Sequence, residues 1–147
     1  MLLLLGLLLV LLTVAGATVT YDFVTTLSVN GVAKGAPRTV SVSGGSDQAI
    51  REPMPIAADT PLAFACVIAK LKALRIEADG IISISTNDVH GGAVGQAPIL
   101  LAANTPILWN SSSGLANPLT ANVTALYITN ASAAIVNLQI DKLEDPT

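Results

Sequence analysis

Residues 123–141 read VTALYITNASAAIVNLQID, and this stretch decides the fold class. Apolar and polar residues alternate on both sides of a short Asn-Ala-Ser-Ala segment, which is the period of a β-strand with one buried face. Leu126 and Ile128 share one side of the first run, and Leu138 and Ile140 share one side of the second. We therefore expect an antiparallel hairpin whose apolar face covers another sheet, because a lone hairpin is only marginally stable.

The opposite face of this predicted hairpin carries hydroxyl and amide side chains rather than charges. Such groups can form hydrogen bonds with a flat partner, so we expect this face to be a contact surface. Its candidate residues are Tyr127, Thr129, Asn137 and Gln139.

The same alternation opens the chain after residue 17. Residues 18–29 alternate as a strand, and Asn30-Gly31 predicts a turn because both residues tolerate positive φ. A shorter run follows at residues 39–43, with Val40 and Val42 predicted to point inward. The inward side of the first run is Val19, Tyr21, Phe23, Leu27 and Val29.

The middle of the chain contains further short strands. Residues 51–61 are rich in proline, which predicts an edge strand or a loop. Residues 62–79 predict a strand, one short helical turn near Ile68–Lys72 and another strand, with a full helix as the alternative. Asp79-Gly80 predicts a tight hairpin turn into residues 81–88.

Two more strands are expected in residues 97–110, with loops on either side. Nine or ten short strands separated by turn signals predict an all-β fold, an antiparallel β-sandwich of jelly-roll-like type. We expect residues 18–147 to form one such domain.

Residues 1–17, MLLLLGLLLVLLTVAGA, form a separate hydrophobic segment. The apolar run is short for a membrane-spanning helix, and it ends in a small-x-small pattern typical of signal-peptidase cleavage near Ala17. No Lys or Arg precedes Lys34, whereas a secretory signal normally begins with a positive region. A secretory signal, a lipid-facing anchor and an upstream extension all remain open, and a membrane contact is expected only if the segment is retained.

Charge argues against nucleic acid as a partner. The net charge is −3, and the chain has no basic run. The cations clustered in residues 70–75 are followed at once by Glu77 and Asp79. Binding to phosphate backbones requires a basic surface, so no nucleic-acid contact is expected.

The residues that usually carry chemistry are scarce, and we expect no catalytic residue, no metal site and no cofactor. Cys66 lies in an apolar run, which indicates a buried thiol. His90 has Asp88 beside it, but the chain has no second histidine to complete a metal site. Trp109 is expected in the core.

A calcium site would require loops to bring together four carboxylates that are scattered in the sequence: Asp22, Asp47, Asp79 and Asp88.

Three Asn-x-Ser/Thr sequons begin at Asn110, Asn122 and Asn130. They are glycosylation sites only in a eukaryotic secretory route.

Four segments carry a family resemblance. KALRIEADGIISISTND (72–88), PILLAANTPILWN (98–110), NPLTANVTALYITNAS (117–132) and NLQIDKLEDPT (137–147) resemble small β-sandwich structural proteins of tailed-phage virions. The resemblance covers residues 18–147 and departs at the leucine-rich start. It implies a non-enzymatic capsid-decoration or head/tail accessory protein, located in the virion.

The expected partners are other virion proteins and further copies of the chain, with a trimer as the expected oligomer. The alternative is a secreted or cell-surface module that binds a glycan or a protein, which the leader and the sequons suggest.

Overall fold

The computed structural model describes residues 18–26, 28–88 and 96–145. The leader at residues 1–17 and the loop that contains His90 lie outside this range, so the predictions made for them stay open. The described residues contain twelve strands and no helix, which confirms the all-β class. No helical segment in these ranges has the length and hydrophobicity needed to span a bilayer.

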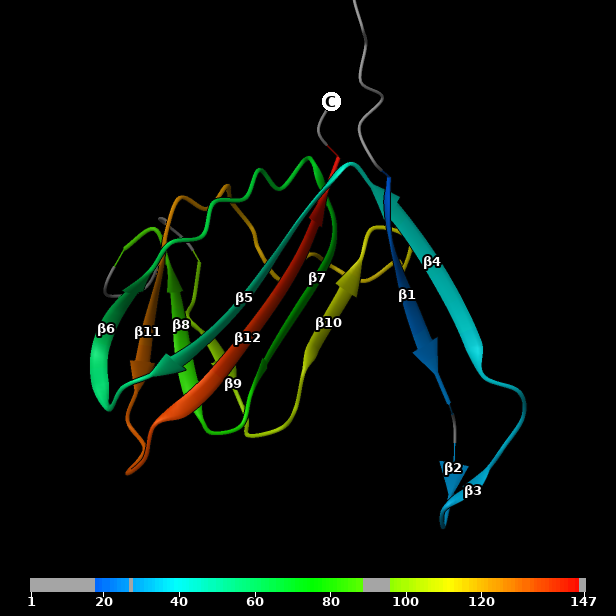
Figure 1. The fold of residues 1–147 in the computed structure, drawn as a ribbon, viewed down its shortest axis with the longest axis horizontal. Helices are drawn as coiled ribbons and strands as arrows, with labels where there is room; N and C mark the ends of the chain where they lie inside the picture. The colour runs from blue at the N-terminus through cyan, green and yellow to red at the C-terminus, as the bar shows by residue number, and fades with distance from the viewer. Residues whose placement is uncertain (1–17, 27, 89–95, 146–147) are drawn as a thin grey trace, which may run out of the picture.

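Eight strands form two four-stranded antiparallel sheets that face each other (Figure 1). Sheet I has the order β10-β7-β12-β5, and sheet II has the order β6-β11-β8-β9. The strands are β5 (Ser46–Met54), β6 (Ala57–Leu62), β7 (Leu71–Ala78), β8 (Ile82–Thr86), β9 (Ile99–Leu101), β10 (Ile107–Asn110), β11 (Leu126–Asn130) and β12 (Val136–Glu144).

The strand order is that of a jelly roll. The connections β5–β6, β7–β8, β9–β10 and β11–β12 each pass from one sheet to the other. The side chains between the two sheets form the core. Its centre includes Ile76 and Ile140 of sheet I and Ile84 and Ile128 of sheet II, each at most 2% exposed. Burial of each such side chain contributes about 1.5–3 kcal/mol.

The hairpin predicted at residues 123–141 is wrong. β11 pairs with β6 and β8 in sheet II, whereas β12 pairs with β5 and β7 in sheet I. The predicted hairpin turn at Asp79-Gly80 is wrong for the same reason, since β7 and β8 also lie in different sheets. Alternation shows that one face of a strand is buried, and this holds equally for a hairpin and for two strands that face each other across a core.

Side chains in the crossing loops stabilise these connections. The buried Asn130 amide donates to the carbonyls of Met54 at 3.0 Å and Ala134 at 2.9 Å. A Cβ at Gly80 would overlap a methyl group of Val136, so glycine permits the two crossing loops to lie in contact. Both features hold the end of the sandwich closed.

The first part of the chain forms a two-stranded arm (residues 19–44). β1 (Val19–Thr25) pairs with β4 (Arg38–Gly44) over seven residue pairs, and β2 (Ser28–Val29) with β3 (Val32–Ala33) at the far end. The turn between β2 and β3 has φ of 51° at Asn30 and 76° at Gly31, which confirms the turn prediction. Figure 1 shows the arm extending away from the two sheets at the right of the view.

Only the base of the arm packs on the body. Val42 is buried against Ala73 and Leu143, which lie on the outer face of sheet I, and Val19 and Tyr21 pack around them. Val42 therefore points inward as predicted. Val40 faces the same side of β4 but lies farther along the arm, where it is 42% exposed and not buried as predicted.

Of the remaining local predictions, some are confirmed and one is wrong. β5 and β6 are edge strands, which confirms the prediction from their prolines. A single turn forms at residues 67–71, where Lys70 N donates to Val67 O at 2.8 Å, and the alternative full helix does not form. The strand expected just after Leu62 is wrong, since only an isolated bridge pairs Cys66 with Val123 there.

Candidate interaction surfaces

The four residues of the predicted contact surface do not lie together. Tyr127 and Thr129 are on the outer face of sheet II, and Asn137 and Gln139 are on the outer face of sheet I. Because β11 and β12 belong to opposite sheets, the core separates the two pairs. The prediction of one continuous surface is therefore corrected to two surfaces on opposite sides of the molecule.

The outer face of sheet I carries a network of ion pairs. Asp141 accepts from Arg51 at 2.7 Å and from the Gln139 amide at 2.8 Å. Arg75 lies 3.9 Å from the same carboxylate and pairs with Glu77 as well. These charges are paired with one another, so the network orders this face of the sheet.

A shallow hollow of about 420 Å³ adjoins this network. At its rim Asp79 accepts from the Asn137 backbone at 2.8 Å and from the Asn137 amide at 2.6 Å. These hydrogen bonds lower the pKa of the Asp79 carboxyl from its ordinary value. Asn137 therefore ties β12 to the end of β7, which is a structural role.

The outer face of sheet II is less charged. Tyr127 lies opposite Pro61 on one side and Ser85 on the other. The Thr129 hydroxyl accepts from the backbone of Asp59 at 3.2 Å. Both side chains are half-buried, so this face offers a low-charge, hydrogen-bonding surface of modest relief.

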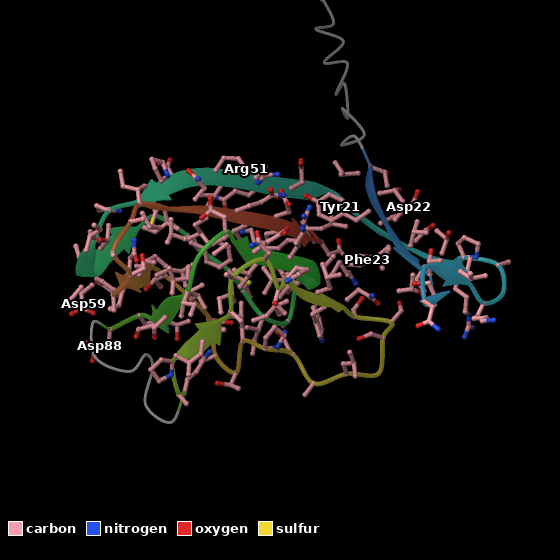
Figure 2. All side chains as sticks on the ribbon, turned by 90° about the horizontal axis from the view of Figure 1, so that it is seen from below. Tyr21, Asp22, Phe23, Arg51, Asp59 and Asp88 are labelled. Carbon is pink, nitrogen blue, oxygen red and sulfur yellow. The ribbon has the colours of Figure 1, made fainter. Side chains whose placement is uncertain are left out.

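An open cavity of about 740 Å³ lies where the arm leaves sheet I. Figure 2 labels Tyr21, Asp22 and Phe23 of β1: Tyr21 and Phe23 pack toward sheet I, whereas Asp22 lies on the other side of the strand and accepts from the Ser41 hydroxyl at 2.6 Å. The other walls of the cavity come from β5, β7, β10 and β12, and the lining residues there include Asp47, Ala49, Arg75, Leu108 and Asp141.

Electrostatics at this cavity are dominated by carboxylates. Partial burial chiefly, and then the charges of Asp47 and Asp141, raise the pKa of Tyr21 from its ordinary value. No local pattern in the sequence marks this cavity, because its walls come together only when the arm folds over sheet I. We refer to it below as the arm-base cavity.

A buried ion pair lies at the end of the core beside Cys66. The Lys142 ammonium donates to Glu144 at 2.6 Å and to the carbonyl of Ala65, and it lies 5.3 Å from the centre of the Phe64 ring. This pair was not predicted from the sequence. A signal was present, since Lys142 continues the inward register of Leu138 and Ile140.

Cys66 itself is 2% exposed, which confirms the predicted buried thiol. Burial chiefly, with the charge of Glu144, raises the pKa of the Cys66 thiol to about 12. A thiolate is therefore scarce at neutral pH, and this position is unsuited to nucleophilic chemistry.

The four aspartates considered for calcium are not brought together. Asp22 and Asp47 line the arm-base cavity, Asp79 is bonded to Asn137, and Figure 2 shows Asp88 at the opposite end of the molecule from Asp22. Among the residues that the structure describes, no three acidic, histidine or cysteine side chains are grouped as a metal site. His90 lies outside those residues.

Trp109 is 8% exposed and its ring nitrogen donates to Leu115 O at 3.1 Å, which confirms the predicted core position.

Two of the three sequon asparagines, Asn110 and Asn130, are buried. The third, Asn122, is exposed and accepts a hydrogen bond from Ile68 N at 3.0 Å. Folded protein would therefore present a single sequon asparagine to solvent.

Comparison with known proteins gives no relative: no family model, curated protein or solved structure matches this chain.

Proposed function

We propose that the chain is a non-enzymatic structural protein of a tailed-phage virion, a capsid-decoration or head/tail accessory protein that acts through protein–protein contacts. The family resemblance of residues 18–147, whose motifs lie in residues 72–147, supports the virion setting. The observation that carries the contact function is the projecting arm. Residues 30–41 are all exposed, including Val32 at 60%. A two-stranded ribbon is marginal alone, so an arm of this kind favours a partner that covers it.

The fold is compatible with this proposal. Jelly rolls occur in viral capsid proteins and in lectins, and the architecture by itself leaves the function open. Arg51, Arg75, Glu77 and Asp141 on the outer face of sheet I are paired with one another, and the Cys66 thiol is buried. These features favour a role in binding over a role in catalysis.

The alternative, a secreted or cell-surface module that binds a glycan or a protein, was suggested in part by the sequons and has less support. Buried Asn130 uses its amide to close the end of the sandwich, so a glycan there is incompatible with the folded state. The leader at residues 1–17, which suggested export, lies outside the described residues.

Quantitative mass spectrometry of purified virions tests the proposal. We expect the protein in gradient-purified particles at a fixed ratio to the major capsid protein, and resistant to washing at moderate salt. A matched phage whose copy of the gene ends at a stop codon after residue 20 supplies the control. Absence of the protein from purified wild-type particles would refute the virion assignment.

A further inference from the structure

The first strand of the arm has an open edge. β1 pairs only with β4, so one row of its backbone N–H and C=O groups makes no backbone hydrogen bond within the described residues. The strand contains no proline, glycine, lysine or arginine, and its one charged residue, Asp22, is engaged by the Ser41 hydroxyl. Such an edge readily accepts a strand from another chain, and proteins usually protect it.

The other strand edges carry the usual protective features. Pro53 and Pro61 lie in β5 and β6, and β5 also has adjacent charged residues. β9 and β10 have only three and four residues. Pro37 and Arg38 stand at the start of β4, the other strand of the arm. Prolines, charges and short length all discourage strand addition, and β1 lacks all three apart from the engaged Asp22.

The arm-base cavity runs along this open edge. Five consecutive residues, 20–24, line it, although they point alternately to the two sides of β1. No residue of β4, which the structure describes in full, is in the lining. The cavity therefore lies beside the edge of the ribbon rather than against one of its faces. Figure 1 agrees, since β1 lies between β4 and the two sheets in that view.

The cavity has room for one strand. A strand of five residues is about 17 Å long, lies about 4.8 Å from its neighbour and has a depth of about 10 Å, so it fills roughly 800 Å³. The cavity measures about 740 Å³. The arm of a second copy has two strands and needs about twice this space, so a single extended segment is the better fit.

The wall opposite β1 indicates which side chains such a segment carries. Inward side chains of an added strand would lie beside Phe23 and face Leu108, which is 49% exposed. Asp47 lines the same cavity, and its carboxylate makes no hydrogen bond or ion pair within the described residues, whereas Arg75 and Asp141 are paired with each other. The inward positions therefore suit apolar residues and one lysine or arginine.

We propose that the arm-base cavity binds an extended segment of a partner protein, which adds to β1 as a third strand of the arm and places apolar side chains against Leu108 and a basic side chain beside Asp47. Hydrogen bonds to the open edge supply affinity, and alternate side chains supply specificity. The leader at residues 1–17 contains no Lys or Arg, so it offers no cation to Asp47.

This inference rests on the proposed function in taking the partner to be another protein of the particle. Two separate measurements distinguish their failures. If a strand-forming peptide binds along β1 but the protein is absent from virions, the virion function fails and strand addition stands. If the protein occurs in virions but no peptide binds along β1, strand addition fails and the virion function stands.

Hydrogen exchange of the purified full-length chain, followed by nuclear magnetic resonance, tests strand addition with a defined probe. The probe is the blocked peptide Thr-Val-Thr-Lys-Thr-Val-Thr, whose alternate side chains are Val, Lys and Val. We expect saturable binding that slows exchange at alternate residues of β1, because alternate residues of a strand bond to the same neighbour. A twin peptide with glutamate in place of lysine should bind at least tenfold more weakly.

Two variants and their matched controls locate the bound peptide. Asp47→Lys and Leu108→Glu change exposed residues of the cavity, and each should weaken binding at least tenfold; Asp47→Lys should also make the glutamate twin the better ligand. The controls are Asp88→Lys, at the opposite end of the molecule, and Leu100→Glu, which is 78% exposed in sheet II. We expect both controls to bind the probe like the wild type.

Strand addition is overturned if the probe at millimolar concentration leaves the exchange of residues 19–25 unchanged, or if both cavity variants bind it like the wild type. It is also overturned if the open edge of β1 is already protected in the free full-length chain, because the leader or a second copy then fills the cavity. Protection that rises with protein concentration would identify the second copy.

Discussion

The buried pair of Lys142 and Glu144 yields a sharp stability prediction for Lys142→Met. The two side chains are only 7% and 16% exposed, so neither is well hydrated. The substitution removes the ammonium group, which donates to Glu144 and to Ala65 O. It also removes the contact between this group and the Phe64 ring. Glu144 keeps its hydrogen bond from Val67 N at 3.1 Å and its hydrogen bond with the Cys66 thiol.

The expected cost follows from leaving one buried charge without its partner. Breaking a buried pair from one side typically costs 3–5 kcal/mol, and the residual exposure of Glu144 favours the lower end, about 3 kcal/mol. The double variant Lys142→Met/Glu144→Gln leaves no buried charge, while the Gln carbonyl still accepts from Val67 N. We expect this variant to lose only about 1 kcal/mol, so the two substitutions should be strongly non-additive.

Urea unfolding followed by the fluorescence of Trp109, the only tryptophan, measures these differences. The m-value should be unchanged, which keeps the comparison within a two-state description. The control is Glu144→Gln alone. The reasoning is refuted if Lys142→Met costs less than 1 kcal/mol, or if the double variant is as unstable as the sum of the two single variants.

Three further predictions concern single residues. A Cβ at Gly44 would lie 2.6 Å from Glu144 O, so Gly44→Ala should loosen the arm base by about 1–3 kcal/mol and speed proteolysis within residues 19–44; an unchanged cleavage rate would contradict the packing. Asn130→Asp should cost at least 2 kcal/mol in urea, because a carboxylate cannot donate to Met54 O; wild-type stability would contradict it. The Cys66 pKa of about 12 against an ordinary 9.0 means that the unfolded chain loses this proton first. Stability is therefore unaffected below pH 9 and should fall between pH 9 and 12 by up to about 1.4 kcal/mol per pH unit; an equally steep fall in Cys66→Ala would exclude this cause.

Local structure was predictable from the sequence because it depends on local physics. Period-two alternation reflects burial of one strand face, and it identified β11 and β12. Asn30-Gly31 identified its turn because both residues accept positive φ. Prolines marked edge strands, since they cannot donate to a neighbouring ladder.

Pairing partners were not predictable in the same way. A strand in a hairpin and a strand facing its neighbour across a core show the same alternation, so the partners of β11 and β12 were wrongly predicted. The same ambiguity affected the arm. Val19 and Tyr21 do bury one face, but against the outside of sheet I rather than in the main core. The arm-base cavity depends on that long-range placement and had no local signal.

Interstrand nuclear Overhauser effects in isotopically labelled protein test the central claim, the assignment of β11 and β12 to opposite sheets. The jelly roll predicts backbone contacts between Ile128 and Ile84 and between Ile140 and Ile76, which are register partners within the two sheets. A continuous ladder of backbone contacts between residues 126–130 and 136–140 would show a simple hairpin and contradict the fold.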